Sequence, residues 1–149
     1  MKIVIQRVSE ASVAVDGQLI ASIGAGMMIL VGVADDDTPA DVAYCTRKAA
    51  ALRIFPDDAG VMNRPVTDCS GEVLAISQFT LLASTRKGNR PSYIHAARPE
   101  LAIPLYDLFC RELSAAIGRD VKKGIFGADM KVSLINDGPV TIIIDSKEQ

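Results

Sequence analysis

The chain contains 149 residues, of which 49% are hydrophobic and 23% are charged, and its formal net charge is −2 at pH 7. This length supports one domain with its own hydrophobic core, and the slightly acidic balance argues against a generally basic nucleic-acid-binding protein. No apolar run approaches the ~20 residues that cross a bilayer, and the first residues lack the pattern of a signal peptide, so we expect a cytoplasmic protein with no membrane partner.

The first third of the sequence predicts several β-strands. Residues 3–8 alternate apolar and polar side chains, which indicates a strand with one buried face, and residues 11–17 continue as a second strand that ends in an Asp-Gly pair. This pair, followed by the apolar residues 18–23, is a typical hairpin signal. Residues 26–33 are apolar throughout, which predicts a strand that is buried on both faces.

Two segments have the periodicity and the end signals of helices. The first begins at Pro39 with Asp37 or Thr38 as its N-cap. Its predicted buried stripe consists of Val42, Cys45 (or Thr46), Ala49 and Leu52. The second is predicted at Pro99–Ile117, followed by a terminating glycine, and we expect Pro104 to distort its early turns.

Short apolar runs at residues 53–55, 72–79, 131–135 and 142–145 predict further strands, and the last two read as a pair around residues 136–141. Many strands with two helices predict a single α/β domain over the whole chain. Its mixed, largely antiparallel sheet would form sandwich-like or barrel-like layers covered by the two helices. Because two helices cover only part of the apolar strand surface, the remainder packs against a second sheet layer or a partner chain, and we expect a homodimer.

The usual catalytic signatures are absent from the sequence. His95 is the single histidine, which excludes a metal site with two histidines, and the three cysteines have neither metal-ligand nor redox spacing. We expect these cysteines to be reduced. No nucleophile elbow or phosphate-binding loop occurs, so no metal and no cofactor is predicted. His95 is either a general base or an exposed loop histidine.

A short basic segment stands out in this slightly acidic chain. Arg86, Lys87 and Arg90 lie within five positions of one another, and Lys122 and Lys123 could extend the positive charge. One interpretation is an ordinary solvated loop. The other is an edge that contacts phosphates, where a few cations position a nucleic-acid backbone without reading its sequence.

A cluster of polar groups occurs at the end of the strand predicted at residues 72–79. Ser77, Gln78 and Thr80 surround Phe79, and active sites of α/β sheets tend to lie at strand ends. Thr80 could act as a nucleophile, but a threonine hydroxyl needs an activating base, and none is visible nearby in the sequence. Alternatively, the strand simply ends here and its hydroxyl groups bond to local backbone.

Residues 136–141, NDGPVT, contain a proline that an ordinary hairpin turn does not need, since Pro139 cannot donate to a sheet ladder. Together with IQRV near the start and SQFTL at residues 77–81, this stretch resembles the signatures of the D-aminoacyl-tRNA deacylase family. The two diagnostic motifs of that family are SQFTL and N-x-G-P-V-T. This sequence has both without departure, and the resemblance extends over essentially the whole chain.

The resemblance implies the fold of that family and a homodimer. In the implied homodimer, the Gly138–Pro139 bond is cis, and these two residues enter the active site of the other subunit. The residues that would support this motif are Arg7, Asn136, Val140 and Thr141. Main-chain carbonyls would capture the α-amino group of the substrate and leave no room for an L side chain, whereas D residues and glycine fit.

The implied reaction is hydrolysis of the ester that joins a D-amino acid, or glycine, to the terminal ribose of tRNA. The implied catalytic residues are Ser77, Gln78, Phe79 and Thr80. Backbone N–H groups around Phe79 and Thr80 would polarise the ester carbonyl. The attacking group is either a water molecule assisted by the 2′-hydroxyl of the tRNA or Thr80 itself.

On this interpretation the partner is the 3′ end of an aminoacylated tRNA, and Ser77 and Gln78 orient its adenosine or the loop. The residues that would contact the acceptor-stem phosphates are Arg86, Lys87 and Arg90. Two alternatives stay open. One is a non-enzymatic nucleic-acid-binding dimer, because some relatives are linked to DNA replication. The other is a structural dimer in which the Gly-Pro pair is a rigid turn.

Overall fold

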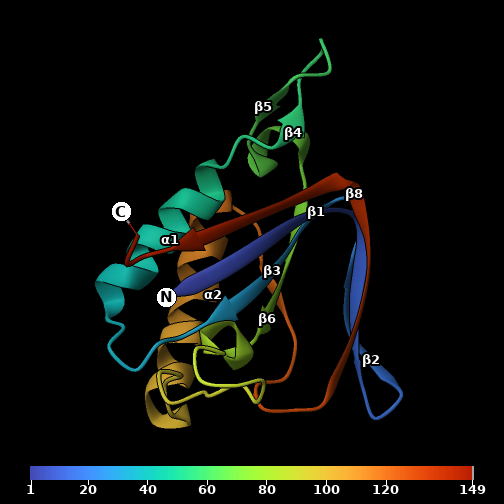
Figure 1. Cartoon of the computed structure of the whole chain (residues 1–149). Helices are drawn as coiled ribbons and strands as arrows, with labels where there is room; N and C mark the ends of the chain where they lie inside the picture. Colours follow the sequence, from blue (N-terminus) through green and yellow to red (C-terminus); the bar gives the residue numbers. More distant parts are fainter. Residues whose placement is uncertain (149) are drawn as a thin grey trace.

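A curved six-stranded sheet with two helices on one face forms the fold of the computed structural model, which describes residues 1–148 (Figure 1). The helices and main strands are α1 (Pro39–Ala51), α2 (Pro99–Ile117), β1 (Lys2–Val15), β2 (Gln18–Ile23), β3 (Gly26–Gly32), β6 (Glu72–Ser77), β7 (Lys122–Lys123) and β8 (Met130–Asp145). β1 pairs antiparallel with β2, β3 and β8, whereas β6 pairs in parallel with β3 and β7. The predicted α/β class, with a mixed, largely antiparallel, barrel-like sheet and two main helices, is confirmed.

The sheet has a hydrophobic core on each of its faces, because successive residues of a strand point to opposite sides. In β3, Met27 and Ile29 pack in the larger core, which also contains the buried faces of both helices. Met28 packs in a smaller core on the other side, together with Val13 of β1 and Met130 of β8. β3 is therefore buried on both faces, as its continuous apolar run predicts.

Both helices are present close to their predicted bounds. Thr38 is the N-cap of α1, and its N–H donates to Asp41 Oδ2 at 2.8 Å. The predicted buried stripe of α1 is confirmed, except that Leu52 follows the helix and is half-buried. α2 ends at Gly118, which has a φ of 67°, and it is continuous through Pro104. The expected distortion at that proline does not interrupt the helix.

The three cysteines are free thiols. Burial raises the pKa of Cys45 to about 12 and that of Cys110 to about 11, so both thiols stay protonated at neutral pH. Within residues 1–148, neither helix has the length and hydropathy that a membrane crossing requires, and no group of His, Cys, Asp and Glu residues is arranged to hold a metal ion.

The interpretation of residues 131–135 and 142–145 as two strands that pair with each other is wrong. Both runs belong to β8, which pairs with β1 on both sides of the Gly-Pro motif. Residues 3–8 and 11–15, predicted as two strands, are likewise parts of the continuous β1. A local pattern does not distinguish a bulged strand from a hairpin, because both place turn-forming residues between two apolar runs.

The pairing of β8 with β1 is interrupted at the Gly-Pro motif. Gln6 lies opposite Thr141 and Val8 lies opposite Asn136, so one residue of β1 faces four residues of β8. Residues 137–140, called the bulge below, therefore loop out of the ladder. The proline is tolerated inside a long strand because the bulge makes no ladder hydrogen bonds there.

The remaining short elements are β4 (Phe55–Pro56), β5 (Met62–Arg64) and the 3-10 turns η1 (Val66–Cys69) and η2 (Phe79–Leu82). The strand predicted at residues 53–55 is displaced to β4, which pairs with β5 in a small hairpin that projects from the sheet (Figure 1). β6 ends at Ser77, two residues earlier than predicted, because the chain turns into η2.

Candidate active site

The segment that follows β6 forms a turn with two free backbone donors. The Gln78 N–H donates to Val31 O at 2.8 Å, which fixes the turn to the end of β3. Within the turn, the Leu81 N–H donates to Gln78 O at 3.3 Å. The Leu81 N–H is the first donor of the turn. The N–H groups of Phe79 and Thr80 come before it in the chain, and neither has an acceptor within residues 1–148. Both groups are therefore available to a ligand.

A glycine at the end of β3 leaves room for this turn. A Cβ atom on Gly32 would lie 2.6 Å from Leu82 Cδ2 and 3.0 Å from both Gln78 O and Leu81 Cβ. Contacts this short do not occur between non-bonded atoms in a relaxed structure. The turn can pack this closely on β3 only because Gly32 has no side chain.

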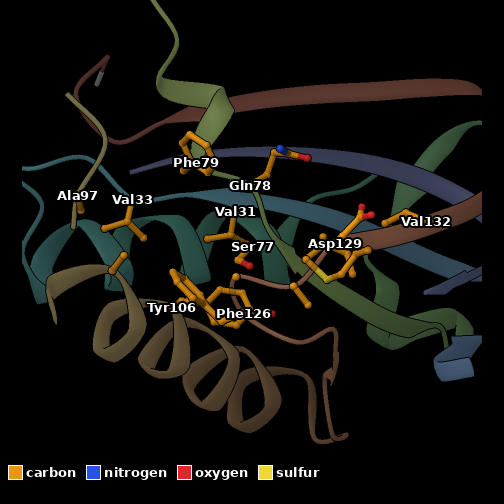
Figure 2. Close-up of a pocket in the computed structure, with 15 residues that line it drawn as sticks. Val31, Val33, Ser77, Gln78, Phe79, Ala97, Tyr106, Phe126, Asp129 and Val132 are labelled. Carbon is orange, nitrogen blue, oxygen red and sulfur yellow. The ribbon is translucent and has the colours of Figure 1, made fainter. Parts of the chain in front are cut away.

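A pocket of about 250 Å³ opens beside the turn (Figure 2). Figure 2 shows Gln78 and Phe79 on one side of it, and Tyr106 of α2 with Phe126 on the opposite side. The Tyr106 hydroxyl donates to Ala75 O at 2.9 Å, and burial raises its pKa well above the ordinary value. Tyr106 therefore lines the pocket as an uncharged side chain whose position is fixed by this hydrogen bond. Most of the other lining residues are apolar.

The Thr80 hydroxyl has an amide as its neighbour, rather than a base. Gln78 Nε2 donates to Thr80 Oγ1 at 2.5 Å. An amide nitrogen cannot take up a proton, and no carboxylate or imidazole in the described part of the chain forms a hydrogen bond with this hydroxyl. The arrangement lacks the activating base that a threonine nucleophile requires.

Arg7, the residue of β1 opposite the bulge, holds the bulge in place. Its Nε donates to Asp137 O at 2.8 Å and its Nη1 donates to Ile54 O at 2.6 Å. The Gly138–Pro139 peptide bond is cis. Because one planar guanidinium group bonds to carbonyls of two segments, Arg7 fixes the bulge relative to the chain before the β4–β5 hairpin.

The Asn136 side chain forms hydrogen bonds with residues at the far end of the bulge. The Val140 N–H donates to Asn136 Oδ1 at 2.7 Å, and Asn136 Nδ2 donates to Val140 O at 3.2 Å and to Thr141 Oγ1 at 3.1 Å. Gly138 and Pro139 stay exposed, and neither lines the pocket of its own chain. The Gly138–Pro139 part of the bulge is therefore open to solvent.

The basic segment is an exposed loop whose two ends are joined. Ser84 and Ser92 exchange backbone hydrogen bonds at 2.8 and 2.9 Å. Between them, Arg86, Lys87 and Arg90 are exposed, and none forms an ion pair with a carboxylate of residues 1–148. The segment therefore carries positive charge that no neighbouring acid offsets.

Three other candidate residues lie outside this arrangement. Lys122 forms an ion pair with Glu72 at 3.1 Å, and Lys123 forms one with Asp107 at 3.0 Å, so their charges are offset and do not extend the basic segment. His95 is exposed and does not line the pocket beside the turn. Its position fits an exposed loop histidine better than a general base of that pocket.

The sequence model of a family described as D-Tyr-tRNA(Tyr) deacylase matches residues 4–145. This chain belongs to that family. Relatives in Chromobacterium violaceum and Opitutus terrae, both named D-aminoacyl-tRNA deacylase, are 59% and 62% identical to it. The alignment covers 99% of this chain and 98% of the relative in the first case, and 98% and 97% in the second.

Two solved structures are similar to this deacylase-family chain. One, described as c-Myc DNA Unwinding Element Binding Protein, has a TM-score of 0.91 and 40% identity, and the match covers 97% of this chain and 98% of the other. The second, described as a probable eukaryotic D-amino acid tRNA deacylase, has a TM-score of 0.82, and the match covers 96% and 97%. At 17% identity, this second similarity concerns the fold alone.

The predicted site residues of this family member form two groups in the structure. In the first group, Ser77, Gln78 and Phe79 line the pocket, and Thr80 lies next to them in the turn η2. The group around the bulge is Arg7, Asn136, Gly138, Pro139, Val140 and Thr141. Gly32, Tyr106 and Phe126 also contribute to the pocket and the turn, although no sequence pattern predicts them there. A lone glycine and two aromatic residues have no local signal that assigns them to a pocket.

Proposed function

We propose that this chain hydrolyses the ester between a D-amino acid, or glycine, and the terminal ribose of tRNA, as a chiral proofreading enzyme that spares L-aminoacyl-tRNA. Its family membership, and relatives about 60% identical over nearly the whole chain, support the deacylase reaction. The observation that carries the chiral part is the exposed bulge, whose main chain is anchored by Arg7 and Asn136.

The main chain of the bulge is suited to recognise an α-amino group. Gly138 and Pro139 take no part in the ladder with β1, so their carbonyl groups can accept hydrogen bonds from a substrate ammonium group. The backbone then occupies the side where an L side chain would project, whereas a D side chain points away. Rejection by steric conflict tolerates many side chains, which favourable contact with one side chain would not.

The bulge can meet a pocket if a second copy of the chain supplies that pocket, so a homodimer is part of the proposal. β8 exposes Ile135 and Ile143, at 54% and 66% of their surface, and pairs with β1 alone among the described strands. An open strand edge with exposed apolar side chains is a surface that proteins usually cover. Two-fold symmetry would then give two equivalent sites, each with the bulge of the other subunit.

Hydrolysis in this site relies on positioning and on stabilisation of the oxyanion. The aminoacyl ester is already activated, so it does not need a strong protein nucleophile. The free N–H groups of Phe79 and Thr80 donate to the ester carbonyl oxygen as it gains negative charge, while Ser77 and Gln78 orient the adenosine. A water molecule, assisted by the neighbouring 2′-hydroxyl of the ribose, attacks the ester carbon. The bond from that carbon to the ribose oxygen then breaks, and the ribose oxygen takes up the proton that the water gives up, which releases the amino acid and free tRNA.

Thr80→Ala is expected to keep kcat within about tenfold of the wild-type value, because the hydroxyl has no base to activate it. Single-turnover hydrolysis of D-tyrosyl-tRNA measures this rate. Thr80→Ser, which retains a hydroxyl, is the matched control. If the alanine variant lost several orders of magnitude while the serine variant stayed active, Thr80 would be the covalent nucleophile.

The basic segment is proposed to contact acceptor-stem phosphates. Reversing the charge of Arg86, Lys87 and Arg90 together should raise KM and flatten its dependence on salt concentration. Each lost phosphate contact removes roughly 0.7–0.9 from the slope of log K against log salt. Reversing the exposed residues Arg47 and Lys48 of α1 is the control, and it should leave the slope unchanged. An equal slope in the wild type and the triple variant would refute the assignment.

Incubation with D-tyrosyl-tRNA and L-tyrosyl-tRNA tests the function directly, and we expect only the D ester to disappear. The alternative is a nucleic-acid-binding dimer, which the similarity to a structure described as a DNA unwinding element binding protein makes worth testing. Such a protein would retain tRNA and hydrolyse neither ester. Hydrolysis of both esters at equal rates would leave an esterase without a chiral filter.

A further inference from the structure

Two aromatic side chains form an exposed pair at the edge of the pocket beside the turn. The rings of Phe79 and Tyr93 meet edge to face, with their centroids 5.1 Å apart and their planes at 71°. Phe79 is 55% exposed and Tyr93 is 39% exposed, so a large part of both rings faces solvent. Exposed aromatic rings of this size are typical of surfaces that bind a flat or apolar partner.

A second hollow is lined by residues that flank the aromatic pair in the chain. It has a volume of about 560 Å³ and is lined by Ser84, Arg86, Lys87, Ser92, Ile94 and His95. Tyr93 lies in the chain between Ser92 and Ile94, and Phe79 lines the pocket beside the turn, so the aromatic pair adjoins both this basic pocket and that pocket. The two pockets and the aromatic pair are therefore neighbours, and together they are called the path below.

The charges along this path favour a polyanion. Arg86 and Lys87 have no carboxylate partner within residues 1–148, although the chain as a whole has a net charge of −2. The acid closest to the imidazole of His95 is Asp35, with a distance of 3.8 Å between Nδ1 and Oδ2. Cations beside an aromatic platform are how proteins bind single-stranded nucleic acid, since bases stack on the rings and phosphates meet the cations.

We propose that the Phe79–Tyr93 pair stacks a base of the unpaired 3′ end of tRNA, next to the terminal adenosine, and that the basic pocket binds the phosphodiester groups beside that base. This inference rests on the proposed deacylase function, because it places the ester in the pocket that Phe79 also lines. It assigns Tyr93 and the basic pocket to the single-stranded end of the substrate, not to the double-stranded stem alone.

A comparison of two substrates distinguishes effects on this path from effects on the ester site. D-tyrosyl-tRNA has the whole 3′ end, whereas D-tyrosyl-adenosine has only the terminal nucleoside. We expect Tyr93→Ala to lower the ratio of kcat/KM for the tRNA substrate to kcat/KM for the adenosine substrate by about tenfold, a typical effect of removing one stacking ring. The ratio cancels any change in the ester site itself, because both substrates place the same ester and terminal nucleoside there.

Further variants distinguish the loss of the aromatic ring from the loss of packing against Phe79. Tyr93→Leu keeps apolar volume against Phe79 and should lower the ratio as Tyr93→Ala does, whereas Tyr93→Phe should restore it. Tyr44→Ala is the matched control, because Tyr44 also lies beside two cations, Arg47 and Lys48, but on α1. It should leave the ratio unchanged.

The outcomes distinguish the two proposals. If the wild-type chain hydrolyses D-tyrosyl-tRNA and both Tyr93→Ala and Tyr93→Leu keep the wild-type ratio, the stacking path is overturned while the deacylase function stands. If the wild-type chain hydrolyses neither substrate, the proposed function fails, and this inference fails with it.

Discussion

Gly138→Ala is expected to lower kcat/KM for D-tyrosyl-tRNA on the order of a hundredfold while the chain stays folded, since a displacement of about 1 Å in a positioned group can have this effect. Gly138 has a φ of +149°, which side-chain-bearing residues rarely adopt. An added Cβ would lie 2.8 Å from Val140 Cγ2 and 2.9 Å from Val140 N. The bulge must shift, and with it the carbonyl groups that we assign to the substrate.

The local strain of this substitution is about 1–3 kcal/mol, well below the total stability of a typical domain, so loss of activity should not reflect unfolding. Gly60→Ala is the matched control: Gly60 also has a positive φ, of 77°, but an added Cβ would meet nothing within 4 Å. Steady-state kinetics with both variants, together with their melting temperatures, measure the effect. Equal activity of the two variants would remove the bulge from the site.

Gly32→Ala is expected to reduce kcat by roughly ten- to a hundredfold by displacing the oxyanion donors. The added Cβ would lie 3.0 Å from Gln78 O, a backbone atom that can move only with the turn. The N–H groups of Phe79 and Thr80 would then shift away from the ester carbonyl. KM should change less than kcat, because these donors act mainly on the charge that develops in the transition state.

Gly24→Ala is the control for this second substitution. An added Cβ on Gly24 would have an ordinary contact, 3.6 Å from Glu72 Oε2. Its kcat should match that of the wild type. If Gly32→Ala also retained the wild-type kcat, the turn would not supply the oxyanion donors.

Local sequence patterns are enough to predict those helices and strands whose formation depends mainly on neighbouring residues. α1 and α2 have helical periodicity and clear end signals, and β3 is apolar at every position, so their type and approximate bounds follow from the sequence. The fold class follows from the number and type of these elements. The family motifs also predict which residues belong to the site.

The geometry of the site depends on contacts between distant parts of the chain. Residues 130–135 pair with the far half of β1, more than 100 positions earlier, and no local signal separates this arrangement from a hairpin. The end of β6 at Ser77 likewise depends on Gln78 bonding to Val31 of another strand. Gly32 matters because a turn about 50 positions later packs on it, which one sequence alone does not reveal.

The central proposal is that each pocket works with the bulge of the other subunit. Mixing Gly138→Ala and Gly32→Ala subunits by co-expression tests it, because a mixed dimer would then contain one site in which the pocket and the bulge are both wild type. We expect the mixture to recover about a quarter of wild-type activity on D-tyrosyl-tRNA, since half of randomly paired dimers are mixed and each has one intact site of two. Activity no higher than that of the two variants assayed separately would contradict the shared site.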